Sequence, residues 1–195
     1  MNFFKYLKYS LILFFILINK NSFSLDQKEI LKIENYLNGF NKLSSNFIQS
    51  SSDGNQAEGS LHLSRPGKMR IEYKKKDNLL IVADGKWLHY YDIELNEKQS
   101  IIIEKSPAWF LLKKKINLKK DFKIEKLENQ KGRTSLILSN KNMENVKYIK
   151  LIFSNTPFVL KKWIIHDINS LETTVSLLNI KKMNKFSPKT FTLNK

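Results

Sequence analysis

The sequence predicts a mainly β protein, built as one curved antiparallel sheet of about eleven strands with an N-terminal helix and a short central helix that cover it. Two observations predict this class. Apolar and polar residues alternate over most of the chain after residue 44, and short turn signals separate the alternating segments. The βαβ rhythm of a nucleotide-binding α/β fold is absent from the sequence.

The first 24 residues have the pattern of a secretory signal peptide. Lys5 and Lys8 precede an apolar run from Tyr9 to Ile18, and the segment ends in the small-x-small pattern Ser22-Phe23-Ser24. A transmembrane anchor is the alternative, but a span needs about 20 apolar residues and this run has roughly half of that. We therefore expect cleavage after Ser24, which leaves residues 25–195 as a single soluble domain exported across the inner membrane.

An amphipathic helix is predicted over residues 27–43. Asp26 and Glu29 fit a capping box at its start. Four apolar residues then recur at helical spacing and form one stripe: Ile30, Ile33, Leu37 and Phe40.

The period changes to two after this helix. The predicted strands are 45–52, 57–64, 68–75, 79–83, 86–92, 98–104, 122–129, 134–140, 146–154, 158–168 and 172–182. Asp84-Gly85 is the clearest hairpin signal, because a type I′ turn needs positive φ at both central residues. Short connections of this kind indicate an antiparallel meander with one apolar face.

One apolar segment interrupts the meander between residues 106 and 112. It predicts a short helix with Ser106 as N-cap and Pro107 at the first helical position. Trp109 in this segment is a candidate lid or ligand contact, whereas Trp163 is expected to be an ordinary core residue.

The composition excludes several kinds of site. The 195 residues contain no cysteine, which excludes a disulfide scaffold, a thiol nucleophile and an acylated N-terminal cysteine. The three histidines, His62, His89 and His166, are too scattered for a metal-ligand cluster. We therefore expect neither a metal nor a cofactor.

The chain is strongly basic, with 34 Lys and Arg residues against 18 Asp and Glu residues and a net charge of +16. Residues 1–24 contain three lysines and no acidic residue, so the exported form has a charge of +13. Such a charge often indicates nucleic-acid binding, but export argues against that partner. Anionic membrane surfaces or acidic protein patches fit better, although lysine runs such as 113–115 are mostly expected to be solvated faces.

Motifs of hydrolases and nucleotide-binding enzymes are absent from the sequence: it has no G-x-S-x-G elbow, no Walker A loop and no H-E-x-x-H. His166 and Asp167 are neighbours on a predicted strand, so their side chains point to opposite faces. We therefore expect a binding protein without catalytic residues.

An ordered set of short motifs runs from the first strand to the central helix. It consists of Phe47-x-Gln49, Gly59-x-Leu61-x-Leu63-x-Arg65-Pro66-Gly67-Lys68-Met69-Arg70, Tyr73, Val82-x-Asp84-Gly85, Leu88-x-Tyr90-Tyr91-Asp92 and Ser106-Pro107-Ala108 followed by Leu111-Leu112. In order and spacing this set resembles the periplasmic outer-membrane lipoprotein carrier family, LolA. The resemblance covers roughly residues 26–112, and the second half shares only the strand rhythm. Ile93 departs from it, because many members have proline there.

This resemblance implies an unclosed antiparallel β-barrel of about eleven strands under a helical lid. It also implies a periplasmic chaperone, monomeric when empty, that takes acylated lipoproteins from an inner-membrane lipoprotein-releasing ABC transporter. Delivery would be to an outer-membrane receptor or to the outer membrane itself. The alternatives are an envelope-stress sensor that binds lipid or lipoprotein on the same fold, and a lipid-modifying enzyme.

Side-chain alternation identifies the residues that would line an apolar hollow in such a carrier. Leu61 and Leu63 share one face of their strand. On the strand that follows, Met69, Ile71 and Tyr73 share one face. The expected acyl-chain contacts are Leu61, Leu63, Met69, Ile71, Tyr73, Trp109, Leu111 and Leu112.

Arg65 is one of only three arginines in the chain, with Arg70 and Arg133. The resemblance implies that it hydrogen-bonds the backbone of the lid and holds the empty carrier closed. The alternative is an arginine at a turn without a special role. We favour the lid latch because arginine is rare here and the surrounding motif matches.

Overall fold

The computed structural model describes residues 26–74, 78–140 and 142–193. The predicted signal segment, residues 1–24, lies outside the described residues. The chain divides into two units, Met1–Asn35 and Tyr36–Lys195. None of the helices in the described ranges has the length and apolarity that crossing a membrane requires.

The first described element is a helix over residues 26–38. Within it Lys32 Nζ lies 3.4 Å from Glu29 Oε2, an ion pair one turn apart. The prediction that this helix continues to residue 43 is wrong. Gly39 directly follows the last helical residue and donates its N–H to the carbonyl of Tyr36 at 3.1 Å, and glycine is a common residue at the end of a helix.

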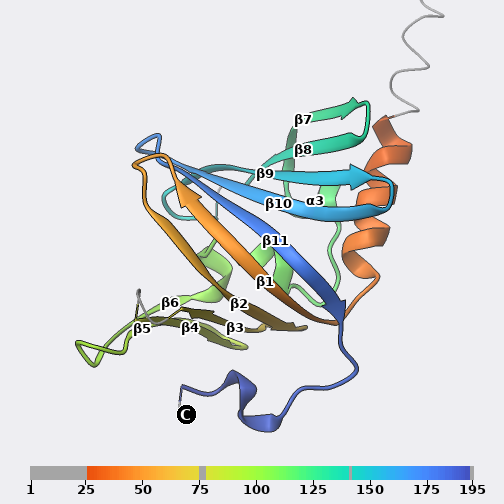
Figure 1. The fold of residues 1–195 in the computed structure, drawn as a ribbon. Helices are drawn as coiled ribbons and strands as arrows, with labels where there is room; N and C mark the ends of the chain where they lie inside the picture. Colours follow the sequence, from red (N-terminus) through yellow and green to blue (C-terminus); the bar gives the residue numbers. More distant parts are fainter. Residues whose placement is uncertain (1–25, 75–77, 141, 194–195) are drawn as a thin grey trace, which may run out of the picture. The chain divides into compact units, whose positions relative to one another are not determined.

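Eleven strands follow and form a single antiparallel sheet in the second unit (Figure 1). They are β1 (Lys42–Ser51), β2 (Gln56–Ser64), β3 (Lys68–Tyr73), β4 (Leu79–Asp84), β5 (Trp87–Asp92), β6 (Glu97–Ile102), β7 (Lys123–Gln130), β8 (Arg133–Ser139), β9 (Val146–Asn155), β10 (Phe158–Asp167) and β11 (Glu172–Lys182). The mainly β class with an unclosed sheet is confirmed, because β6 and β7 are the two edges.

The strand order is β6-β5-β4-β3-β2-β1-β11-β10-β9-β8-β7. Strands that are adjacent in the sheet also follow one another in the chain, with the exception of β1 and β11. These two strands pair in the middle of the sheet and join the two meanders. The register places Phe47 opposite Leu177 on one side and opposite Gly59 of β2 on the other. This pairing brings the N-terminal half of the domain against the C-terminal half.

Alternating burial shows which face of each strand is turned inward. In β2, Leu61 and Leu63 are buried and their neighbours are partly exposed, and in β9 the same holds for Leu151 and Phe153. The period of two in the sequence is thus the signature of a sheet with one buried face.

The central helix differs from its prediction. Helix α2 spans Trp109–Leu112 and is preceded by Ala108, with no side-chain cap. Ser106 is not its N-cap: it ends a 3₁₀ turn, η1 (Ile103–Lys105), and its hydroxyl donates to the carbonyl of Ile103 at 2.7 Å. Because the hydroxyl of Ser106 bonds within this turn, it does not cap helix α2.

A second short helix, α3 (Leu118–Asp121), was not predicted. Its signal is Asn117, whose side chain accepts a hydrogen bond from the backbone N–H of Lys120 at 3.0 Å. Asn117 is therefore an ordinary N-cap.

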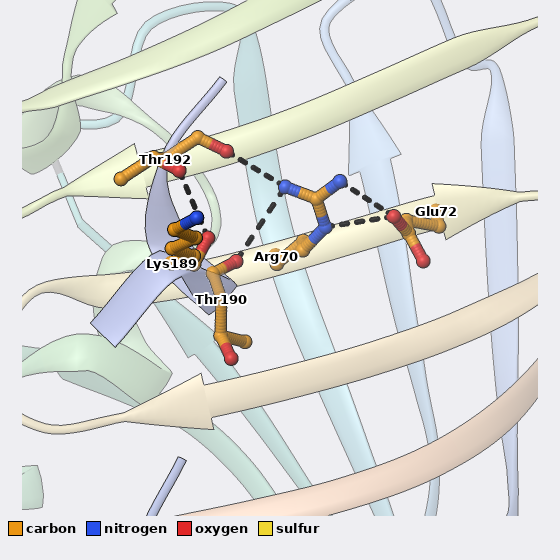
Figure 2. Close-up of polar contacts among 5 residues, drawn as sticks. All are labelled: Arg70, Glu72, Lys189, Thr190 and Thr192. Atoms are coloured by element: carbon orange, nitrogen blue, oxygen red, sulfur yellow. Dashed lines mark hydrogen bonds and ion pairs between the residues drawn. The ribbon is translucent and has the colours of Figure 1, made fainter. Parts of the chain in front are cut away.

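The chain after β11 forms a C-terminal strap, residues 183–193, which includes the 3₁₀ turn η2 (Pro188–Phe191) and packs against β3 and β4. Arg70 is 8% exposed and holds the strap, as Figure 2 shows. Its Nη1 donates to the carbonyl of Thr192 at 2.8 Å and to that of Thr190 at 3.5 Å, and its Nε donates to Glu72 at 2.8 Å. One guanidinium thus links the sheet to the end of the chain.

We expect Arg70→Lys to release the strap while the sheet stays folded. An ammonium is a point charge and cannot bond Glu72 and two carbonyls in one plane, and a hydrogen bond to a charged group contributes about 1.5–3 kcal/mol. Hydrogen exchange should therefore speed up at residues 183–193 and stay slow in β1 and β11. Arg133→Lys is the control, because Arg133 is exposed and donates to Gln130. Unchanged exchange in the strap would contradict this role of Arg70.

We also expect acid to lower the free energy of unfolding through His62, which lies beside the strap. His62 lies opposite Arg70 in the β2–β3 register, and its ring centroid is 5.4 Å from that of Phe186 in the strap. Burial lowers the pKa of His62 below its ordinary value of 6.5; the charge of Glu72 raises it and that of Arg70 lowers it.

The unfolded chain therefore binds this proton more readily than the folded chain. The free energy of unfolding should be highest above about pH 6.5 and should fall as the pH drops through the lower pKa of folded His62. Urea unfolding between pH 8 and pH 5 measures this. His62→Phe keeps a ring against Phe186 and should lose part of the dependence; an identical pH profile would assign the dependence to other groups.

Candidate ligand-binding cavity

An apolar cavity of about 130 Å³ lies inside the sheet of the second unit. Its walls come from the inward faces of β1–β5, β10 and β11. The apolar wall residues are Phe47, Leu61, Met69, Ile71, Ile81, Leu88, Trp163, Ile165 and Val175. The polar ones are Gln49, Tyr73, Tyr90 and Thr173.

The segment from Pro107 to Leu111 forms one wall of this cavity and is called its roof below. Phe110 of α2 packs edge-to-face on Trp163 of β10, with ring centroids 6.2 Å apart. At the end of the helix, the carbonyl of Leu112 accepts a hydrogen bond from the N–H of Gly67 at 2.9 Å. Side-chain packing and a few hydrogen bonds thus hold the roof in place.

Arg65 also contacts the roof. Its Nε donates to the carbonyl of Leu111 at 2.6 Å, and its Nη1 donates to the carbonyls of Leu37 and, at 3.2 Å, of Phe40. The guanidinium carbon also lies 4.7 Å from the centroid of the Phe40 ring. One side chain therefore binds the backbone of α2 and of the segment that precedes β1.

Arg65 is costly to bury. It is 8% exposed, its Nη2 has no hydrogen-bond partner among the described residues, and burial lowers its pKa to about 10. The side chain still carries its charge at neutral pH. A buried charge is held by carbonyl oxygens here, with no carboxylate among its hydrogen-bond partners in the described ranges.

The structure brings most of the predicted contact residues together. Leu61, Met69, Ile71, Tyr73 and Leu111 line the cavity. Leu63 lies next to it, in a much smaller apolar gap shared with Leu61, Leu111 and Trp163. Leu112 is fully buried beside the cavity wall.

Trp109 is not among the cavity-lining residues, although it was expected there. Its neighbours Ala108 and Phe110 do line the cavity. Successive side chains of a helix point about 100° apart, so the direction of a single residue depends on where the helix starts. The helix begins at Trp109, whereas the prediction placed its first residue at Pro107.

Several lining residues were missed by the sequence analysis. Phe47 and Gln49 alternate on β1, Leu88 and Tyr90 alternate on β5, and β10 and β11 contribute Ile165, Thr173 and Val175. Their alternation was visible in the sequence. Their position around the same hollow as β2 and β3 was not.

Polar side chains also meet on β5 and its neighbours. Nδ1 of His89 is 2.7 Å from Oγ of Ser100, and its Nε2 is 3.2 Å from Oδ2 of Asp84. Asp84 also accepts the backbone N–H groups of Lys86 and Trp87, both at 2.9 Å. Because His89 alternates with the cavity residues of β5, this chain of hydrogen bonds faces away from the cavity and braces the hairpin.

No group of three or more potential metal ligands occurs in the residues that the structure covers. The cavity itself contains no charged side chain. The chemistry of its walls suits an apolar ligand with a few uncharged polar atoms.

Comparison with known proteins places this domain. The family model described as outer membrane lipoprotein carrier protein LolA matches residues 38–194, a range that includes all eleven strands. The chain belongs to the LolA family. The predicted membership is therefore confirmed over the whole sheet, beyond the N-terminal half in which the motifs lie.

Relatives named as lipoprotein carriers agree with this assignment, one of them over nearly the full length. An outer-membrane lipoprotein carrier protein from Legionella pneumophila (strain Lens) is 30% identical over 193 residues, covering 94% of this chain and 93% of the relative. One from Chromobacterium violaceum is 30% identical over 138 residues, covering 67% and 66%. The crystal structure of a LolA superfamily protein from Nitrosomonas europaea shares the fold, with a TM-score of 0.50, 9% identity and 85% and 96% coverage.

Proposed function

We propose that this protein is a periplasmic carrier that encloses the acyl chains of lipoproteins and takes them from the inner membrane to the outer membrane. The observation that carries the proposal is the apolar cavity beneath a roof that Arg65 and a few other contacts hold. The names of its relatives support lipoprotein cargo. Removing each CH₂ group of an acyl chain from water contributes about 0.8 kcal/mol to binding. Burial alone can therefore hold such cargo, and the site needs no catalytic residue.

The volume of the cavity indicates how the carrier works. A dry apolar cavity of about 150 Å³ takes up one benzene molecule, and this cavity has about 130 Å³. A myristoyl chain, with about 14 carbons, does not fit. With the roof in the described position the cavity is therefore too small for such a chain, and the roof residues must move before cargo enters.

Opening the roof breaks few polar contacts, but it uncovers the buried apolar side chains of Phe110, Leu111 and Leu112. Separating Arg65 from Leu111, Gly67 from Leu112 and Phe110 from Trp163 exposes one helical turn, while the sheet keeps its pairing. Cargo then replaces the roof as the apolar cover of the sheet. Arg65 acts as the latch whose bonds re-form when cargo leaves.

A two-step assay tests the function. The exported form is incubated with inner-membrane vesicles that contain a lipoprotein-releasing ABC transporter and ATP, and soluble lipoprotein is measured. Outer membranes are then added, and transfer of the lipoprotein is measured. Release followed by transfer is expected. Release without transfer would favour a lipoprotein-binding sensor, and no release at all would overturn the carrier function.

We also infer that the exported form begins at Leu25 and is monomeric when empty. The basis for the first residue is the signal pattern of residues 1–24, and the monomer is what membership of the carrier family implies. N-terminal sequencing of protein isolated from the periplasm and its sedimentation rate test both points. A chain that keeps residues 1–24 and stays with the membrane would indicate an anchored protein and contradict the shuttle.

A further inference from the structure

Two polar side chains in the cavity wall keep unused hydrogen-bond donors. Gln49 of β1 accepts a hydrogen bond at Oε1 from the hydroxyl of Tyr73, at 2.9 Å. Its amide nitrogen makes no hydrogen bond to any residue in the described ranges. An amide has two N–H donors, so this bond fixes the orientation of Gln49 and leaves both donors for a ligand.

The packing around Gly59 sets the position of this pair. Phe47 lies two residues before Gln49 on β1 and packs edge-to-face on Tyr73, with ring centroids 5.4 Å apart. Gly59, between them on β2, has room for no side chain: a Cβ there would lie 2.7 Å from the Phe47 ring. The missing side chain lets the Phe47 and Tyr73 rings meet across β2, and Tyr73 then reaches Gln49.

Tyr90 supplies the second donor from β5. It lies opposite Ile81 in the register, and both residues line the cavity. Burial raises the pKa of its hydroxyl, and within the described part of the chain that hydroxyl has no hydrogen-bond partner. A phenol among apolar side chains is stabilised when an acceptor enters beside it.

We propose that the amide of Gln49 and the hydroxyl of Tyr90 donate hydrogen bonds to the ester carbonyls of the bound acyl chains. This inference rests on the proposed carrier function. Both groups are uncharged donors, and an ester carbonyl is an acceptor without a donor, so the chemistries match. The cavity then selects acyl esters over plain alkyl chains and fixes how deep a chain enters.

Two lipids that differ only in the linkage test this selectivity. One is a diacyl phospholipid with ester bonds, and the other is its dialkyl ether analogue with the same chains and headgroup. Each displaces an apolar dye from the purified exported form. We expect about tenfold tighter binding of the ester lipid, which corresponds to about 1.4 kcal/mol for the two hydrogen bonds together.

Variants assign the preference to the two residues. Tyr90→Phe and Gln49→Leu should each lower the preference to roughly threefold, and the double variant should abolish it. Tyr91→Phe is the matched control, because Tyr91 is the next residue on β5 and its hydroxyl donates to Asn96 at 2.6 Å. It should keep the full preference.

The outcomes separate the two proposals. Equal binding of ester and ether lipids by the wild type would overturn the ester inference and leave the carrier function standing. A preference that survives in the double variant would overturn it as well. Failure of both lipids to displace the dye would count against the carrier function itself.

Discussion

Arg65→Leu is expected to fold, to take up lipoprotein as well as the wild type, and to pass on at most about one tenth of it to outer membranes. Arg65 is the one side chain that donates to Leu111 in the roof and to Leu37 and Phe40 before β1 among the described residues. Each such bond contributes about 1.5–3 kcal/mol, and about 1.4 kcal/mol is a tenfold change in population.

The direction of the effect follows from when these bonds exist. In the proposed carrier mechanism these bonds are broken when cargo holds the roof open and re-form when it closes, so they favour release. Leucine removes them and adds an apolar side chain near the cargo. The fold should survive, because domains have about 5–15 kcal/mol of stability and the substitution also removes a buried charge whose Nη2 has no partner in the described part of the chain.

Arg65→Lys should transfer less lipoprotein than the wild type and more than Arg65→Leu. An ammonium keeps the charge, but it cannot bond several carbonyls in one plane as a guanidinium does. Arg133→Leu is the control, because this arginine is exposed and donates to Gln130. The measurement is the second step of the two-step assay. Wild-type transfer by Arg65→Leu would show that Arg65 is an ordinary turn residue.

The strands could be predicted closely because each has one buried face. β10 was expected at 158–168 and lies at Phe158–Asp167, and β11 lies at the predicted 172–182. The end of the first helix could not be predicted this way. Phe40 continues the helical spacing from Leu37, but it lies beyond Gly39 and packs against Arg65 instead.

The cavity could be predicted only in part for a different reason. Alternation along β2 and β3 identifies Leu61 and Met69, which face the same way on paired strands. That β10 and β11 close the same hollow depends on the pairing of β1 with β11, between segments more than 100 residues apart in the chain. Such pairing leaves no local pattern, so the sequence alone could not place Ile165 and Val175 at the cavity.

Polar selectivity had the weakest signal. Gln49 was visible as part of the Phe47-x-Gln49 motif, but a lone glutamine on a strand is usually a solvated residue. Its orientation depends on Tyr73 and on the absence of a side chain at Gly59. Three strands must be placed before the role of one amide can be inferred.

Gly59→Val is expected to cost at least about 3 kcal/mol of the free energy of unfolding, with loss of the cooperative transition as the extreme result. A Cβ at residue 59 would lie 2.2 Å from the backbone carbonyl of Glu72 and 2.7 Å from the ring of Phe47. Real contacts of carbon with oxygen are over 3 Å, so β2 and β3 must move apart.

A flexible side chain could yield, but the closest atom here is backbone on the paired strand. Moving β3 shifts Tyr73 opposite Gly59, and with it the hydrogen bond that orients Gln49. Urea unfolding measures the loss, and Ser60→Val is the matched control, because it adds the same kind of side chain on the opposite face of β2. If Gly59→Val unfolds at the same urea concentration as Ser60→Val, β2 and β3 are not as close as described. The ring packing that positions the Gln49 amide depends on this close approach and would then have to be rejected as well.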